Sequence, residues 1–317
     1  MNNQIYCFGI INLDVITYPV NSWPVSGELV HADNVIFTPG GTALNTAGTI
    51  KILSGKPVEL LGCVGNDDAG TRVKDFLQSL GLSTTGLVVH PKTNTGICIV
   101  TIDSSGERSF IYSSGTNSTI SSFNEFLPKI ENESFVHLGG GLDLPLLSGL
   151  SLFQIVRELK EKGCFVSMDL AWDWMNNGWG SLVSSLKFID LLSMNEKEAA
   201  FLTGLHNVSD SASRIVQAGC PLVIIKLGSR GAFVHSQEYR GIVPGFSVPA
   251  VDSTGTGDAF CGALIYSLTN HWPVYESIRF ANAVGALCIQ QVGALAGIRS
   301  YQETLRFIQE QDASTPK

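Results

Sequence analysis

Short apolar runs alternate with longer segments of helical length along much of the chain. Residues 135–138 form a strand-length run, residues 145–162 have helical length, and residues 164–169 form a second strand-length run. Similar strand-length runs occur at residues 5–11, 58–64, 191–194 and 221–227, and two helices are predicted to end near residues 54 and 80. This alternation of strand and helix predicts a parallel sheet with right-handed crossovers.

A second group of β-prone runs has no helices between its members. Residues 29–37, 95–101 and 108–113 are rich in β-formers, and residues 102–107 have the polar, glycine-containing composition of a hairpin turn. We expect these runs to form a small sheet outside the main one. The glycines at 139–141 predict a flexible strand exit, and the tail from 309 to 317 is expected to fray.

The composition is that of a folded protein with a large core. The 317 residues are 44% hydrophobic and 15% charged, which excludes a disordered chain. A formal net charge of −8 supplies no basic footprint, so nucleic acid is not expected as a main partner. The uncharged segment 281–298 contains Asn282, Gln290 and Gln291, which favour a buried helix plus loop over a membrane span.

Seven cysteines are scattered singly through apolar stretches, with no CxxC pair. This distribution indicates reduced core residues and not a disulfide frame or a zinc site. The first residues lack the basic start of a signal peptide. We therefore expect a cytoplasmic protein with no membrane partner.

One glycine-rich stretch carries the strongest chemical signal. Gly255 and Gly257 flank Thr256, Asp258 follows, and an uncharged run of helical length begins there. A helix start with close-lying glycines forms a candidate anion hole for a phosphate. Asp258 would repel that phosphate, but it is accounted for if it accepts the proton of a substrate hydroxyl during phosphoryl transfer. The alternative is that Asp258 only caps the helix.

Other polar side chains stand where α/β folds bind ligands. Asn12 and Asp14 follow the first strand-length run and are candidate hydroxyl binders, with a self-capped turn as the alternative. Asn195 and Glu198 are three apart, so they share a helical face, and the same spacing fits a capping box. Arg108 is expected to be a solvated surface residue, although contact with an anionic substrate is an alternative.

Two further groups are expected to be structural. Asp67 and Asp68 stand in a first helical turn, where acids usually cap the helix and do not bind a metal. Three tryptophans follow residue 169: Trp172, Trp174 and Trp179. Packing is the expected role of these tryptophans, and stacking on a sugar ring is the alternative.

The glycine-rich stretch resembles the Asp-Thr-x-Gly-Ala-Gly-Asp-x-Phe signature of the ribokinase-like, or PfkB, carbohydrate kinases, with Ser253 and Thr256 as departures. Upstream, Gly-Gly-Thr-Ala-Leu-Asn-Thr-Ala resembles the family's Gly-Gly-x-x-x-Asn-x-Ala motif. The resemblance implies that Asp258 is the catalytic base beside the anion hole. It also implies sugar binding by Gly40, Gly41 and Asn45, together with Asn12 and Asp14. The Lys that ribokinases often carry is Thr42 here, so the sugar stays open.

The resemblance extends to the nucleotide side. It implies nucleotide binding by a set spread over the second half of the chain: Asn195, Lys226, Gly228, Gly231 and Asn282. Glu198 would place Mg²⁺ through water, and Asp252 would hold a monovalent cation such as K⁺ with residues 291–297, or would only anchor the turn. The implied architecture is a ribokinase-like α/β fold over residues 1–317 as a single domain. It has a doubly wound, mainly parallel sheet flanked by helices, with a β-lid from segments near 12–38 and 92–118 that can mediate a homodimer.

These motifs predict an ATP-dependent kinase that transfers the γ-phosphate to a hydroxyl of a small sugar, as ribokinases and fructokinases do. Neither a P-loop sequence nor a His-Arg-Asp loop is present, so those kinase classes are unsupported. We expect Asp258 to act with an unshifted, ionised carboxylate. A nucleoside kinase of the same family and a sugar-binding sensor without turnover remain alternatives. The sequence does not define the sugar or whether it arrives phosphorylated.

Overall fold

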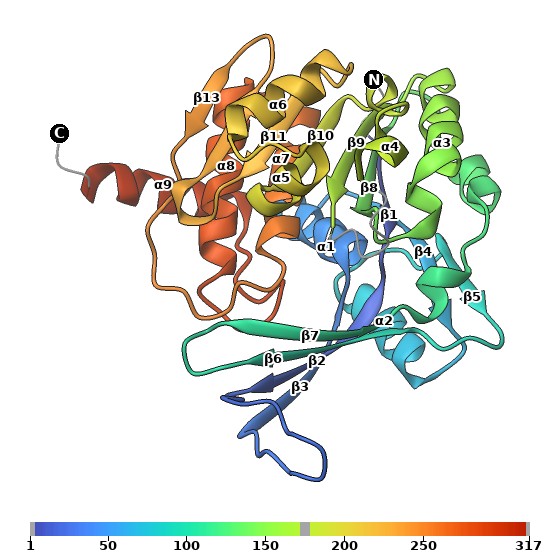
Figure 1. Cartoon of the computed structure of the whole chain (residues 1–317), viewed down its shortest axis with the longest axis vertical. Helices are drawn as coiled ribbons and strands as arrows, with labels where there is room; N and C mark the ends of the chain where they lie inside the picture. The colour runs from blue at the N-terminus through green and yellow to red at the C-terminus, as the bar shows by residue number, and fades with distance from the viewer. Residues whose placement is uncertain (1–3, 172–177, 315–317) are drawn as a thin grey trace.

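The computed structural model describes residues 4–171 and 178–314, and within them the main sheet has nine strands in the order β13-β12-β11-β10-β9-β8-β1-β4-β5 (Figure 1). The seven neighbouring strands β11, β10, β9, β8, β1, β4 and β5 pair in parallel, and β12 and β13 add an antiparallel edge next to β11. The strand bounds are β1 Ile5–Gly9, β4 Glu59–Gly65, β5 Leu87–His90, β8 Phe135–Gly141, β9 Phe165–Leu170, β10 Leu191–Asn195, β11 Leu222–Lys226, β12 Ala232–His235 and β13 Arg240–Val243.

Helices cover both faces of this sheet, which confirms the doubly wound prediction. One face is covered by α3 (Gly149–Glu161), α4 (Gly178–Leu182), α5 (Glu196–Thr203) and α6 (Val208–Gln217). The other face is covered by α1 (Thr42–Ser54), α2 (Asp68–Ser79), α7 (Thr256–Thr269) and α8 (Val274–Cys288). Large apolar cores therefore lie on both sides of the sheet, because the parallel strands bury both of their faces.

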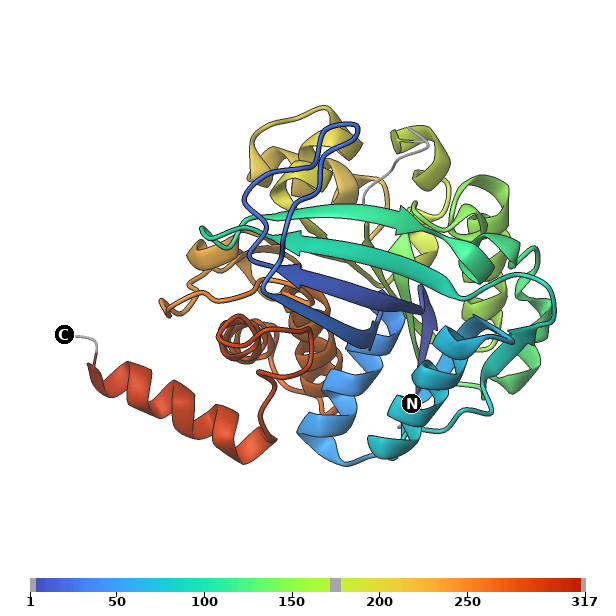
Figure 2. The same ribbon diagram turned by 90° about the horizontal axis from the view of Figure 1, so that it is seen from below.

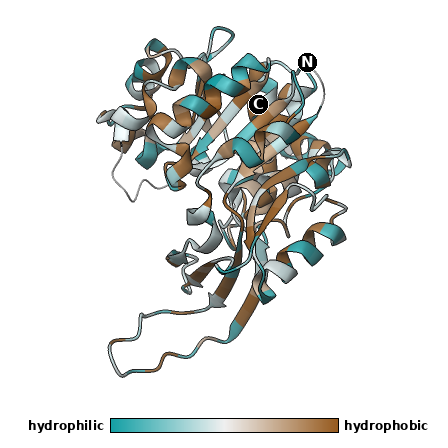
Figure 3. Ribbon diagram, turned by 90° about the vertical axis from the view of Figure 1, so that its right-hand side faces the viewer, coloured by the Kyte–Doolittle hydropathy of each residue, from teal (hydrophilic) through white to brown (hydrophobic). Residues whose placement is uncertain are grey.

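A second sheet lies across the carboxyl edge of the main sheet. In the described residues it has four strands in the order β3-β2-β6-β7, with bounds β2 Asn12–Tyr18, β3 Asn34–Gly40, β6 Gly96–Ile102 and β7 Arg108–Ser113. Figure 1 shows it below the body of the molecule, Figure 2, seen from below, shows it lying across the front of that body, and Figure 3 shows the loop between β2 and β3 projecting away from the body. We call this sheet the lid.

Strand β2 was not predicted as a separate strand, although it lies in the segment near 12–38 that was assigned to the lid. Only Ile10 and Ile11 separate β1 from β2, so the two strands look like one apolar run in the sequence. Asn12 and Asp14 consequently stand in a strand and not in a self-capped turn: they pair with Gly40 and Thr38 of β3. The chain therefore passes from the main sheet into the lid at the point where the candidate hydroxyl binders begin.

Two other predictions were wrong. The glycines at 139–141 belong to β8 and are buried, with a register shift between Gly139 and Gly141 where β8 pairs with β9. The tail does not fray at residue 309, because α9 runs over Tyr301–Ser314 and its Tyr301, Leu305 and Ile308 pack on the α7–α8 core. Helical spacing of these apolar side chains accounts for the added helix.

Candidate active site

A cavity of about 1210 Å³ lies between the lid and the carboxyl edge of the main sheet. Ligands of open α/β sheets bind at this edge. Of the residues predicted for the site, those that line the cavity are Asn12, Asp14, Gly41, Asn45, Asn195, Glu198, Lys226, Gly228, Gly231, Gly255, Thr256, Gly257, Asp258 and Asn282. The other two predicted residues, Gly40 and Asp252, are not among the residues that line the cavity.

The anion turn is formed by Gly255, Thr256 and Gly257 at the start of α7. Gly255 has φ 72, and a Cβ atom there would lie 2.3 Å from the Cβ of Ala294, so the turn is pressed against the following loop. A side chain at this position would meet both the left-handed backbone and that loop. The turn leaves the first N–H groups of α7 facing the cavity side without partners inside the helix.

Asp258 faces the cavity and does not cap its helix. Its Oδ2 accepts a hydrogen bond of 2.8 Å from Nδ2 of Asn45 on α1, and no backbone N–H among the described residues donates to its carboxylate. Burial raises the pKa of Asp258 to about 7, although the Asn45 bond opposes this. The expectation of an unshifted carboxylate is therefore wrong, because the surrounding protein removes water from this group.

The lid contributes a second buried carboxylate. Nδ2 of Asn12 donates a short hydrogen bond to Oδ1 of Asp14, while burial raises the pKa of Asp14 to about 7. Gly40 stands close behind, because a Cβ atom there would lie 2.2 Å from Oδ2 of Asp14. Gly41 has φ 97, and a Cβ atom there would lie 2.4 Å from the carbonyl oxygen of Ile10. The glycine pair thus lets the start of α1 approach Asn12 and Asp14 closely.

Three buried side-chain oxygens of α1 have no hydrogen bond to any described residue, and those of Asn45 and Thr42 belong to side chains that line the cavity, unlike that of Thr49. Buried polar atoms are normally hydrogen-bonded, so Oδ1 of Asn45 and Oγ1 of Thr42 are suited to a ligand hydroxyl. Thr42 was not among the predicted site residues, because only its position in the glycine motif marks it in the sequence.

At the other end of the cavity, two of the predicted nucleotide residues, Asn195 and Asn282, are held by hydrogen bonds within the protein. Asn195 and Glu198 form the capping box of α5: the Glu198 N–H donates to Oδ1 of Asn195 at 2.8 Å, and the Asn195 N–H donates to Oε2 of Glu198 at 2.7 Å. Nδ2 of Asn282 donates to the carbonyl oxygens of Val243 and Pro244 at 3.1 and 3.0 Å. Burial raises the pKa of Glu198 to about 7.

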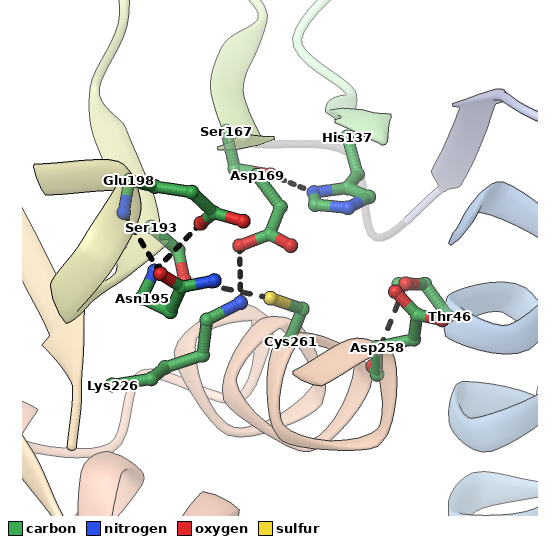
Figure 4. A network of polar contacts seen from close by, with 10 residues as sticks. All are labelled: Thr46, His137, Ser167, Asp169, Ser193, Asn195, Glu198, Lys226, Asp258 and Cys261. Carbon is green, nitrogen blue, oxygen red and sulfur yellow. Dashed lines mark hydrogen bonds and ion pairs between the residues drawn. The ribbon is translucent and has the colours of Figure 1, made fainter. Parts of the chain in front are cut away.

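A buried ion pair joins the ends of β9 and β11. Nζ of Lys226 lies 2.6 Å from Oδ1 of Asp169, and Figure 4 shows the pair beside Asn195 and Glu198. Burial would lower the pKa of Lys226, but the charge of Asp169 and other nearby groups outweighs it and raises the pKa. Asp169 was not predicted as a site residue, since at the sequence level it is only the last polar residue of a strand run.

Asp252 is held as its predicted anchoring role requires, whereas Arg108 differs from its predicted surroundings. Asp252 is buried, and its oxygens accept three hydrogen bonds, from the N–H and Oγ1 of Thr254 and from the N–H of Gly293. Arg108 is not a fully solvated surface residue: it is half-buried and lines the cavity from β7. Burial lowers the pKa of Arg108, and the charge of Asp252 opposes this.

The groups expected to be structural behave accordingly where they are described. Asp67 caps α2 by accepting a 2.8 Å bond from the Gly70 N–H. Trp172 and Trp174 lie outside the described residues, whereas Trp179 packs under the Arg214 guanidinium at 4.5 Å. Among the described helices, none is long and apolar enough to cross a membrane.

Comparison with known proteins places the chain in a family. The model of the pfkB family of carbohydrate kinases matches residues 2–300. The ribokinase of Haemophilus influenzae is 30% identical, over 98% of this chain and 99% of the relative, and a fructokinase of Vibrio alginolyticus is 29% identical over 85% and 91%. The solved ribokinase of Arabidopsis thaliana, complexed with ribose and ATP, superposes with a TM-score of 0.79 at 25% identity, covering 96% of this chain and 98% of that one.

Proposed function

The chain belongs to the pfkB family of carbohydrate kinases, and on this premise we propose that it transfers the γ-phosphate of ATP to a hydroxyl of a small sugar. The observation that carries the proposal is the placement of Asp258. Its carboxylate faces the cavity directly after the anion turn and is held by Asn45, whose Oδ1 is free to accept from a ligand. A base must lie within hydrogen-bond reach of the attacking hydroxyl, and this arrangement provides one.

In the proposed reaction, the acceptor hydroxyl oxygen attacks the γ-phosphorus. A new P–O bond forms, the bond from the γ-phosphorus to the β–γ bridging oxygen breaks, and its electron pair leaves on ADP. The hydroxyl proton passes to the Asp258 carboxylate. We propose that the amides of Gly255, Thr256 and Gly257, which line the cavity at the start of α7, hold charge on the transferring group, the main catalytic effect in phosphoryl transfer. The raised pKa of Asp258, about 7, suits a base that works near neutral pH.

The acceptor is proposed to lie between the lid and α1. Asn12 and Asp14 would contact its hydroxyls from the lid, while Asn45, Gly41 and its neighbour Gly40 shape the opposite wall. A carboxylate that accepts from two neighbouring hydroxyls suits a polyol. A nucleoside acceptor would place its base in the same cavity, so it remains the alternative.

The nucleotide is proposed to lie along β10, β11 and α8. Asn195, Lys226, Gly228, Gly231 and Asn282 line that end of the cavity. A magnesium ion fits beside Glu198 through water, because Oε1 of Glu198 has no hydrogen bond within the described residues and the side chain faces the cavity. Bound there, magnesium would neutralise phosphate charge.

For Asp252, we propose that it anchors the anion turn and can also face a monovalent cation held by carbonyls of residues 291–297. Its three hydrogen bonds account for the anchoring role without an ion. Rates should be higher in potassium than in a bulky organic cation at equal ionic strength if the ion binds. Equal rates would leave Asp252 as an anchor alone.

The lid is proposed to mediate a homodimer. Register places Phe37, Val15, Ile99 and Ile111 in one row across all four strands, on the face opposite Asp14 and Cys98. Phe37 and Ile111 are 55% and 51% exposed, and such an apolar row is suited to burial against a second copy. Sedimentation equilibrium should give twice the chain mass, and Ile111→Lys should give the monomer.

All seven cysteines are free, in keeping with the proposed cytoplasmic location.

An acceptor screen tests the proposed function. Purified protein with ATP and magnesium is offered free sugars, sugar phosphates and nucleosides, and ADP and the phosphorylated product are both quantified. We expect equal amounts of ADP and product with a free sugar. Product with nucleosides alone would support the alternative kinase, and sugar binding by calorimetry without any ADP would indicate a sensor.

A further inference from the structure

The buried ion pair of Lys226 and Asp169 lies on the wall of the cavity and not in the core. The Lys226 side chain is 16% exposed and that of Asp169 is 7% exposed, and β10 runs between the strands that carry them. Removing two charges from water costs about as much as their attraction returns, so a pair of this kind adds little to stability. A charged ligand accounts better for its position on the cavity wall.

The Lys226 ammonium is next to the anion turn. A Cβ atom at Gly257 would lie 3.2 Å from Nζ of Lys226, nearer than any other atom outside the turn. Gly257 is the second residue of α7: the Thr256 N–H donates to the carbonyl oxygen of Ser253 at 3.3 Å, whereas the N–H groups of Gly257 and Asp258 have no partner among the described residues. The ammonium and these amides therefore form one continuous positive surface, which suits the terminal phosphate of a nucleotide.

Most of the hydrogen-bonding capacity of Lys226 is unused. An ammonium has three donors, and within the described residues Nζ makes one hydrogen bond, to Oδ1 of Asp169. In the same residues, the cavity wall contains one other cationic side chain, Arg108, which comes from the lid. Lys226 is thus the cation that the main sheet itself supplies, with donors left for oxygen atoms of a ligand.

We propose that Lys226 is a catalytic residue that contacts a non-bridging oxygen of the γ-phosphoryl group, and that Asp169 is the residue that positions it. The proposal rests on the proposed kinase function. While the phosphorus changes its bond from the ADP oxygen to the acceptor oxygen, negative charge on its non-bridging oxygens stays beside the ammonium. Asp169 accepts a hydrogen bond from one N–H of the Lys226 ammonium and thereby fixes the direction of its other two N–H groups.

The test compares Lys226→Met, Asp169→Asn and the double variant. Removing one donor to the transferring group typically lowers the rate about 10²–10³-fold, and we expect that loss of kcat in Lys226→Met. Binding of a non-hydrolysable ATP analogue should weaken much more than binding of ADP, since only the former has the γ-group. Asp169→Asn should lose less, and the double variant should be no slower than Lys226→Met, because Asp169 acts through Lys226.

A matched control is the Lys160–Asp190 pair, which joins α3 to the segment before β10 at 2.8 Å outside the cavity. Lys160→Met should leave kcat and the ATP-to-ADP preference unchanged. If Lys226→Met shows a kcat within threefold of the parent, or weakens both nucleotides equally, the proposal is wrong. If Lys226→Met does not fold, unchanged kcat and nucleotide preference in Asp169→Asn overturn it. Nucleotide binding can be measured without turnover, so an inactive parent protein would refute the proposed function while leaving this test in place.

Discussion

The two ends of the cavity are built in different ways. At the acceptor end, Asn45 and Thr42 each keep a buried oxygen without a partner in the described residues, and burial raises the pKa of Asp14. At the nucleotide end, Asn195 is tied to Glu198 and Asn282 to the backbone of the loop after β13. The acceptor end therefore has unmet hydrogen-bonding capacity, whereas Asn195 and Asn282 at the nucleotide end are already held by bonds within the protein, and the unused donors of Lys226 lie beside the anion turn.

This difference indicates where specificity resides. Unpaired buried groups strongly favour a ligand that completes them and reject one that does not. Side chains that are already bonded within the protein contribute to ligand binding mainly by shaping the cavity and holding its backbone. The loss of one such side chain should therefore weaken binding less than the loss of an unpaired one. Substitutions at the acceptor end and at the catalytic centre should accordingly have large effects, and those at the nucleotide end small ones.

The largest effect is expected from Asp258→Asn. This variant keeps the shape and can still accept the Asn45 bond, but it cannot take the proton, so kcat should fall about 10²–10⁴-fold. Nucleotide affinity, measured by calorimetry, should change little. Asp68→Asn, in the first turn of α2 and away from the cavity, is the matched control and should keep full activity. Near-normal turnover of a folded Asp258→Asn protein would refute the base assignment.

The pH dependence should follow from the same residue. A base must be ionised to accept a proton, and burial raises the pKa of Asp258 to about 7. Catalysis should therefore be fully present above that pH and should fall about tenfold per unit below it. Initial rates at saturating nucleotide between pH 5 and 9 measure this. A profile that stays flat down to pH 5 would contradict the raised pKa.

Asp14→Ala tests the acceptor end. Hydrogen bonds to charged groups contribute about 1.5–3 kcal/mol, so the acceptor Kd should rise about tenfold or more while the nucleotide Kd stays unchanged. Asp103→Ala changes an exposed aspartate in the hairpin turn of the same lid and should alter neither constant. Unchanged acceptor affinity in calorimetry would remove Asp14 from the sugar site.

Asn282→Ala should give the smallest effect. The variant loses two bonds to the loop after β13, and we expect a rise of about three- to tenfold in the nucleotide KM with the acceptor KM unchanged. The matched control is Asn270→Ala, which also removes a side-chain bond to the backbone but at the end of α7 and away from the cavity; it should leave both KM values unchanged. If Asn282→Ala proved more damaging than Asp14→Ala, the contrast between the two ends would be wrong.

The parts of the site that the sequence predicted are those that depend on local order. The turn before Asp258 and the capping box of Asn195 and Glu198 are defined by residues within a few positions of one another. The strand and helix alternation likewise predicted the main sheet. Such features need only propensity, spacing and turn chemistry.

What was missed depends on distant contacts. The role of Asp169 follows from Lys226, 57 positions away, and the place of Arg108 follows from how the lid lies over the sheet. The raised pKa of Asp258 is set by burial, which no local pattern encodes. Strand β2 was hidden because two apolar residues separate it from β1.

The short passage from β1 into β2 also limits how substrate range can evolve. Asn12 and Asp14 stand in the strand that connects the main sheet to the lid, so replacing them would change both the proposed sugar contact and this connection. Cys98 and Tyr112 pair next to Asp14 on the same cavity wall, yet they lie on β6 and β7, away from that connection. Among enzymes descended from a common ancestor, we therefore expect new acceptors to be gained first through changes at Cys98 and Tyr112, with Asn12 and Asp14 the last to vary.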